Sequence, residues 1–188
     1  MLLIPLLRKA PKRYLQLHKD TAMKELLIAI SIFSVKIGEA NVTATKFQIE
    51  NNWLGFEPIK NEQIQNVEKR LGIILPEDYK EFLKISNGFS APNNVEPTFH
   101  KVEQIDYLRN IEKHTIESYN YLPELENSIL IAGKDEEQYF LLIPPKNVNE
   151  KWRYWKFANW YPGEHEFSGL SEYFKETKNY LEKEYAEK

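Results

Sequence analysis

Residues 61–88 constrain the fold of this chain more than any other part of its sequence. They read as two short amphipathic helices, separated by a Leu-Pro pair and closed by an Asn-Gly pair. Asn61 is predicted to cap the first helix, because its side-chain oxygen can accept a backbone N–H that has no helical partner. Gly72 suits the left-handed residue that ends this helix. Pro76 suits the start of the second helix, since the N–H that proline lacks would be unpaired there.

Each of the two predicted helices has one apolar face. Residues three or four positions apart lie on the same side of a helix and can be buried together. The apolar residues at this spacing are Ile64, Val67 and Leu71 in the first helix and Tyr79, Phe82 and Leu83 in the second. We therefore expect these residues to form the core, and to identify the fold rather than the surface that acts.

These positions belong to a longer ordered set: Trp53, Ile64, Glu68, Leu71, Gly72, Leu75, Pro76, Tyr79, Phe82, Leu83, Asn87 and Gly88. The set resembles the signature of the SUKH superfamily, which includes fungal regulators of cell-wall assembly and bacterial immunity proteins of polymorphic toxin systems. The resemblance is dense over residues 53–88 and continues more loosely, in the right order, to the C-terminus. It implies an α+β fold with N-terminal helices, a mostly antiparallel sheet and a closing C-terminal helix.

The second half of the chain is predicted to form the sheet and the closing helix. Residues 128–132 and 138–143 are apolar runs of strand length, and the acidic turn 133–137 between them predicts a hairpin. The aromatic run 151–160 is a third strand candidate, and the Pro-Gly pair at 162–163 then turns the chain. The last helix carries an apolar stripe made of Leu170, Tyr173, Phe174, Thr177 and Leu181. Helices followed by a meander and a closing helix give an α+β layout.

Four shorter segments complete the predicted layout. Residues 43–51 are expected to form a helix that leads into Trp53, and residues 103–118 another helix. Residues 90–94, Ser-Ala-Pro-Asn-Asn, are rich in turn formers, so we expect a loop on the surface. Residues 98–102 are a candidate short strand.

The N-terminal region contains an apolar run at residues 26–35 that allows two interpretations. It follows basic residues, as the core of a secretory signal would, but charged residues flank it closely and no small-x-small cleavage site follows at once. The run is also shorter than the ~20 residues that span a bilayer. We therefore favour a buried helix over residues 21–36, capped by Asp20 or Thr21.

Charge is distributed unevenly along the chain. Residues 1–60 carry a net charge of +4, whereas residues 61–188 carry −7. An acidic domain argues against nucleic-acid binding and favours a basic partner. We expect residues 1–50 to form a helical N-terminal extension and residues 51–188 the SUKH-like domain. The extension either packs on the domain or lies close to a membrane.

No constellation of residues in the sequence predicts catalysis or a metal site. Cysteine is absent, which excludes disulfides, thiol catalysis and Cys-type zinc sites. The four histidines are scattered, and His165 has carboxylate neighbours that would point to the opposite face of a strand. Glu68 has no partner acid or base, so we expect it to bond to a nearby backbone amide. We predict a protein that is not an enzyme and uses no cofactor or metal.

Binding of a protein partner is better supported by the sequence. The predicted hairpin tip gathers three carboxylates, and a following loop joins aromatic residues to acids; two further carboxylates precede the first long strand, at Glu124 and Glu126. Interfaces favour aromatic anchors at the centre and charges at the rim. The predicted partner-binding residues are Asp135, Glu136, Glu137, Trp160, Tyr161, Glu164 and Glu166. The alternatives are a solvated acidic face and, for the two aromatic residues, packing under the last helix.

The resemblance to SUKH proteins implies a function as well as a fold. It implies a non-enzymatic immunity protein that binds and neutralises a cognate toxin. Because many such toxins are nucleases with basic surfaces, we expect a basic, nuclease-type partner. We further expect a cytoplasmic monomer that binds neither nucleic acid nor membrane. The alternative is a regulatory scaffold that binds housekeeping or cell-envelope proteins.

Overall fold

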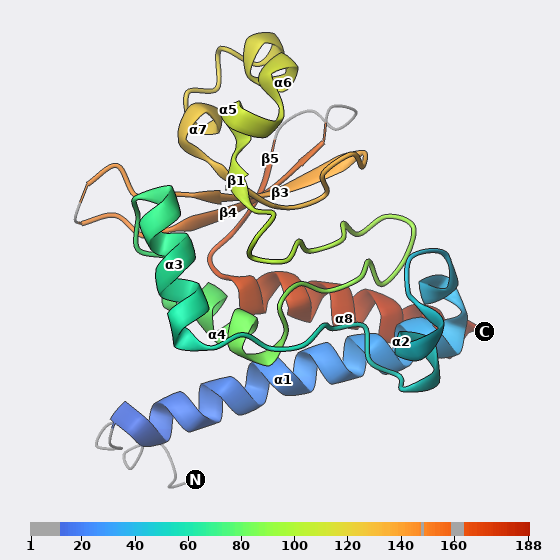
Figure 1. The fold of residues 1–188 in the computed structure, drawn as a ribbon. Coiled ribbons are helices and arrows are strands. Elements are labelled where there is room, and N and C mark those ends of the chain that lie inside the picture. Colours follow the sequence, from blue (N-terminus) through green and yellow to red (C-terminus); the bar gives the residue numbers. More distant parts are fainter. Residues whose placement is uncertain (1–11, 148, 159–163) are drawn as a thin grey trace, which may run out of the picture.

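An antiparallel sheet lies between two layers of helices (Figure 1). The computed structural model describes residues 12–147, 149–158 and 164–188, and within these the sheet has five strands in the order β1-β2-β3-β4-β5. The strands are β1 (Asp106–Tyr107), β2 (Ile129–Ala132), β3 (Gln138–Ile143), β4 (Arg153–Ala158) and β5 (Glu164–Phe167). Each strand pairs with the next along the chain, which gives an antiparallel meander. The predicted α+β class is confirmed.

Each face of the sheet has its own hydrophobic core, because successive side chains of a strand point to opposite faces. Leu130, Leu141 and Trp155 lie on the face covered by α5 (Leu108–Ile111), α6 (Lys113–Ser118) and α7 (Glu124–Asn127). Phe140 and Leu142 lie on the other face, where the main core forms. The helices on that side are α1 (Lys12–Ile37), α3 (Asn61–Leu71), α4 (Glu77–Ile85) and α8 (Leu170–Glu187). Side chains in a strand alternate between faces, so one run of apolar residues fills both cores.

The paired helices predicted from residues 61–88 are present as α3 and α4. Their apolar stripes are buried, and Gly72 ends α3 in the left-handed region with φ 70°. Glu68 accepts the backbone N–H of Leu75 at 2.9 Å, as expected. The cap of α3 was predicted one residue too late. Asn61 is already helical, and the cap is made by Lys60, whose N–H is accepted by the Gln63 side chain at 3.0 Å.

Pro76, predicted as the first residue of the second helix, is instead its N-cap. It lies in the extended region, with φ −64° and ψ 147°, and the helix begins at Glu77. A proline in this place costs no helical hydrogen bond, because the N–H that it lacks would lie outside the helix. The second helix therefore starts one residue later than predicted, while its buried face is unchanged.

The N-terminal apolar run is part of a helix that packs into the main core. Met23, Leu27 and Ile30 on α1 are fully buried in it, which supports the helix interpretation. The helix starts at Lys12 rather than at residue 21, so Asp20 and Thr21 lie inside it and do not cap it. The sequence from 12 to 20 contains neither Gly nor Pro, and nothing there stops a helix. Among the described residues, no helix is long and apolar enough to cross a membrane.

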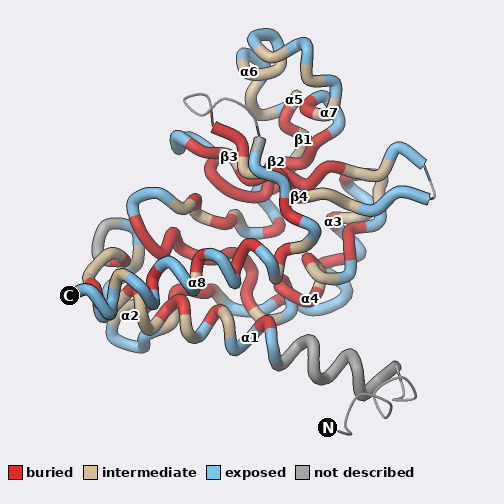
Figure 2. The backbone as a smooth tube through the Cα atoms, turned by 180° about the vertical axis from the view of Figure 1, so that it is seen from behind, coloured by how far each residue is buried: buried red, intermediate tan, exposed pale blue. Residues whose placement is uncertain are grey.

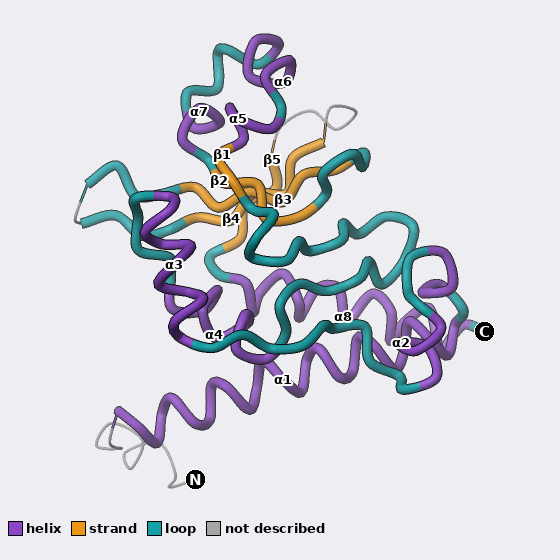
Figure 3. Tube along the Cα trace, in the orientation of Figure 1, coloured by secondary structure: helices purple, strands orange, loops and turns teal. Residues whose placement is uncertain are grey.

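A long irregular segment, residues 86–105, runs between the sheet and α8 (Figure 3). The predicted surface loop at 90–94 is wrong for its first four residues, which are buried. Side chains from the N-terminal region supply the hydrogen bonds that water would otherwise make. The Ser34 hydroxyl donates to the carbonyl of Pro92, and the Thr43 hydroxyl donates to that of Ala91 at 2.6 Å. Buried backbone needs such partners, and here they come from remote sequence.

The predicted strand at 98–102 and helix at 103–118 are also wrong. Phe99 forms only isolated bridges, to Phe89 and Ala132. Beyond it the chain forms β1, α5 and α6 in place of one long helix. Arg70 on α3 donates to the carbonyls of Val102 at 3.2 Å and of residue 105 at 2.8 Å. The carbonyl of residue 105 would be an acceptor inside the predicted helix, so the guanidinium stabilises a non-helical path.

The remaining predictions concern the ends of elements. The strands predicted at 128–132, 138–143 and 151–160 are confirmed as β2, β3 and β4, although β4 is shorter. A further strand, β5, was expected to be loop. The stripe of α8 is buried as predicted, and Figure 2 shows buried and exposed residues alternating along this helix. The helix predicted at 43–51 shortens to α2 (Lys46–Glu50), which follows the 3-10 helix η2 (Glu39–Val42).

One aromatic side chain joins the layers of the main core. Phe99 is 2% exposed, and its ring centroid lies 5.3 Å from Phe140 on β3 and 5.5 Å from Phe82 on α4. It also lies 5.6 Å from Tyr173 and 5.4 Å from Phe174, both on α8. Aromatic pairs at these separations add to the energy of burial. Phe99 therefore ties the irregular segment to the sheet and to two helices.

We predict that Phe99→Ala lowers the free energy of unfolding by about 3–5 kcal/mol, because it leaves a cavity at this junction. Urea denaturation followed by circular dichroism measures the change. Phe47→Ala is the matched control: Phe47 is 71% exposed, and its loss should change stability by no more than about 0.5 kcal/mol. Equal stabilities for the two variants would contradict the role given to Phe99.

Candidate partner-binding site

The acidic hairpin tip between β2 and β3 is a fixed turn with exposed carboxylates. Gly133 has φ 86°, and a Cβ on it would lie 1.8 Å from the carbonyl oxygen of Gln138. Asp135 adopts the left-handed region as well, with φ 63°, where Asp is better tolerated than most residues. Asp135, Glu136 and Glu137 are all exposed. The backbone thus presents the predicted carboxylates to solvent in one defined arrangement.

Two hollows flank this tip, and Glu136 lines both of them. The first, of about 320 Å³, is lined by Thr43, Ala91, Asn93, Asn94, Val95, Glu96, Glu136, Glu137 and Gln138. The second, of about 450 Å³, is lined by Phe56, Thr98, Phe99, His100, Lys101, Gln104, Lys134, Asp135 and Glu136. The carboxylate of Glu136 accepts the backbone N–H of Thr98 at 3.0 Å. This bond fixes the tip to the irregular segment between the hollows.

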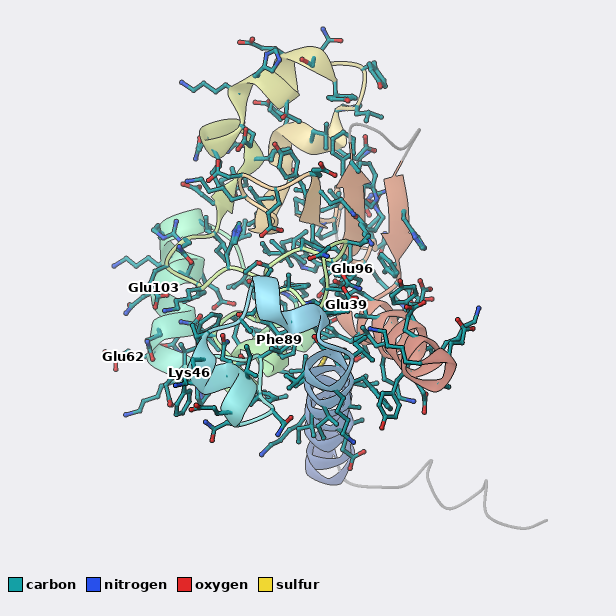
Figure 4. The ribbon with its side chains drawn as sticks, turned by 90° about the vertical axis from the view of Figure 1, so that its right-hand side faces the viewer. Glu39, Lys46, Glu62, Phe89, Glu96 and Glu103 are labelled. Carbon is teal, nitrogen blue, oxygen red and sulfur yellow. The ribbon has the colours of Figure 1, made fainter. Side chains whose placement is uncertain are left out.

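Glu96, which is labelled in Figure 4, lines the first hollow, and its charge is neutralised within the protein. Lys156 donates to its Oε1 at 2.7 Å, and the Tyr173 hydroxyl donates to its Oε2 at 2.9 Å. Burial, together with the charge of Glu96, raises the pKa of Tyr173 well above its usual value, so this hydroxyl remains a donor. The negative charge available to a partner here therefore comes from the tip and not from Glu96.

Two of the predicted carboxylates outside the tip are also balanced by neighbours. Glu166 on β5 accepts from the indole N–H of Trp155 at 2.6 Å and from Arg153 at 3.1 Å. Glu124 accepts from Lys146 at 2.9 Å and lies 3.6 Å from Arg153. The hydrogen bond from Lys146 is the main cause that lowers the pKa of Glu124. These two carboxylates belong to a mixed-charge network rather than to an uncompensated acidic face.

Strand register brings part of the predicted site together. Gln138 pairs with Ala158 and Phe157 with Glu164, so the hairpin tip and the start of β5 lie at the same end of the sheet. Glu166 pairs with Trp155, farther from that end. Trp160 and Tyr161, and the predicted turn at 162–163, lie outside the described residues, as does the side chain of Glu164. The interface role of these residues stays a prediction.

His100, which was not among the predicted site residues, forms a hydrogen bond with the backbone of the hairpin tip. Its Nε2 accepts the backbone N–H of Lys134 at 3.0 Å, and its Nδ1 is buried without a hydrogen-bond partner among the described atoms. Burial and, secondly, the charge of Lys134 lower the pKa of His100 from 6.5 to about 4. No local sequence pattern distinguishes this histidine from the others, because its partner is 34 residues away.

The described residues contain no cluster of three or more His, Asp or Glu side chains that could hold a metal ion. His165 on β5 stacks on Phe167, with ring centroids 4.3 Å apart, while Glu166 points to Trp155 on the other face. The exposed carboxylates of the site can accept hydrogen bonds and attract positively charged groups.

Comparison with models of protein families identifies the family of this chain. The sequence model of a protein family described as SMI1 / KNR4 family (SUKH-1) matches residues 58–183, two thirds of the chain. The match includes α3, α4, the whole sheet and most of α8, and it begins after α1 and α2. No curated protein shows a significant match to the chain.

We predict that the free energy of unfolding falls as the pH is lowered from about 6.5 towards about 4. In this window the unfolded chain binds a proton at His100 that the folded chain does not, so acid favours unfolding. In His100→Gln the amide oxygen can still accept the Lys134 N–H but does not titrate. Its stability should depend less steeply on pH, as measured by urea denaturation across this range. His114→Gln, at an exposed position on α6, is the control; an unchanged slope in His100→Gln would contradict the assignment.

Proposed function

Since the chain belongs to the SMI1 / KNR4 family (SUKH-1), we propose that it is an immunity protein that binds and neutralises a cognate protein toxin. In this proposal it catalyses no reaction, and it acts as a monomer in the cytoplasm. The observation that carries the proposal is the hairpin tip, where exposed carboxylates stand between two hollows on a rigid turn.

The electrostatics favour a basic partner. Residues 61–188 carry a net charge of −7, and Asp135, Glu136 and Glu137 are exposed at one end of the sheet. Exposed charges around an interface mainly accelerate association and reject partners of like charge. The hollows beside the tip could then receive side chains of the partner, which would give affinity that charge alone does not supply.

A nuclease-type toxin domain fits these requirements best. A protein that binds nucleic acid needs a basic surface, because the phosphate backbone dominates that affinity. An acidic inhibitor seated on such a surface would exclude the substrate without any chemistry of its own. The preorganised turn would limit the conformational entropy that is lost on binding.

The direct test is to mix the protein with the toxin domain encoded beside its gene. We expect a stable complex by size-exclusion chromatography and calorimetry, and we expect co-expression to rescue cells that the toxin would kill. Absence of both a complex and rescue would refute the proposal. Binding to envelope or housekeeping proteins instead would favour the regulatory scaffold.

We predict that Asp135→Lys combined with Glu137→Lys slows association with the toxin about tenfold or more at low salt, because long-range attraction is reversed. Stopped-flow or surface-based kinetics at low and high salt measure the effect, which should shrink as salt screens it. Glu25→Lys combined with Glu187→Lys is the control, since it changes the net charge equally at exposed positions on α1 and α8. Equal slowing by both pairs would place the interface elsewhere.

A further inference from the structure

A third hollow lies where α1, α2, the end of α4 and the extended residues 53–58 meet. Its volume is about 580 Å³, larger than either hollow beside the hairpin tip. Phe47, Trp53, Phe56 and Ile85 give it an apolar lining. We call it the α2 groove. Its dimensions are in the range of sites that hold a side chain or a small ligand.

The floor of the α2 groove is fixed by buried polar contacts. Gln48, which is 4% exposed, donates to the carbonyl of Leu54 at 2.6 Å and accepts the N–H of Thr45 at 2.9 Å. Gly55 lies against the Trp53 ring so closely that a Cβ would come within 2.4 Å of it. The floor of the groove is therefore preformed, because buried hydrogen bonds and close backbone packing hold it.

Among the described residues, none covers the apolar surface of this groove. Phe47 is 71% exposed, and Trp53 and Ile85 are only partly buried. Large apolar side chains gathered around a hollow indicate an interaction site more strongly than single exposed ones do. Phe47 contributes nothing to the core, because it stands on the solvent side of α2 while Gln48 faces inward.

Charge at the rim of the groove selects among possible occupants. Lys24 and Lys84 line it, against one carboxylate, Glu57. Neither lysine forms an ion pair with another described side chain. Lys46, which precedes Phe47 and is labelled in Figure 4, does not line the groove and is paired with Glu50 at 3.7 Å. The groove thus has the opposite electrostatic preference from the acidic hairpin tip.

We propose that the α2 groove binds a segment of a protein partner in which an aromatic or aliphatic side chain is flanked by Asp or Glu. The apolar side chain inserts between Phe47 and Trp53, and the acidic residues lie against Lys24 and Lys84. Desolvation of Phe47 and Trp53 supplies affinity, while the lysines set the register and exclude basic segments. This site does not require the toxin and stands independently of the function proposed above.

A synthetic peptide of ten residues, with two Phe among Asp and Glu, is the probe. Two matched peptides replace either the Phe residues by Ala or the acidic residues by Lys. The full chain, labelled with ¹⁵N, is titrated with each peptide. We expect saturable binding of the acidic Phe peptide alone, with a shift of the Trp53 indole N–H. Phe47→Ala, and separately Lys24→Glu with Lys84→Glu, should weaken it at least about tenfold.

Tyr121→Ala is the matched control, because Tyr121 is a 68% exposed aromatic residue that does not line the groove. It should bind the peptide as the parent protein does, and the melting temperatures of all variants verify folding. No saturable binding at millimolar peptide would overturn the proposal. So would equal binding of the Lys peptide, undiminished binding to Phe47→Ala, or self-association of the protein that Phe47→Ala abolishes, since the last would assign the groove to a second copy.

Discussion

Burial of an irregular segment is the constraint on which the rest of this structure depends. Residues 86–105 lie between the sheet and α8, where Phe99 packs on both, yet they form almost no regular hydrogen bonds of their own. Backbone groups of neighbouring segments pair some of their N–H and C=O groups, and side chains must pair others. Ser34 on α1 and Arg70 on α3 do this from outside the segment, and Asn87 does it from within, where it accepts the N–H of residue 102 at 2.8 Å. The N-terminal helix is thereby coupled to the wall of the first hollow.

This dependence explains which parts of the fold the sequence predicts. The helices α3, α4 and α8 and the strands β2 and β3 follow from local spacing, because each buries one continuous face or run. Predictions failed where a remote partner decides the conformation. Ser90 and its neighbours look like a surface turn until Ser34 and Thr43 cover them, and Arg70 stops a helix that local propensity favours. The structural pairings involved span 32 to 58 residues.

The candidate site shows the same division. The exposed hairpin tip could be predicted, because a charged turn that connects two buried strands lies at the surface. The compensation of Glu166 could not, because Trp155 and Arg153 reach it only through strand pairing. Nor could His100 or Glu96, whose partners lie 34 and 60 residues away. A net charge counted along the sequence therefore overestimates the negative charge that is available to a partner.

The construction of the hairpin tip has an evolutionary consequence. Gly133 is irreplaceable there, and Gln138 is held by the carbonyl of Val95 at 2.7 Å, but the side chains between them project away from both cores. Lys134, Asp135 and Glu137 could thus be exchanged by mutation with little effect on folding, so long as position 135 tolerates a left-handed backbone. A lineage that must follow a changing adversary could diversify here while its scaffold stays constant.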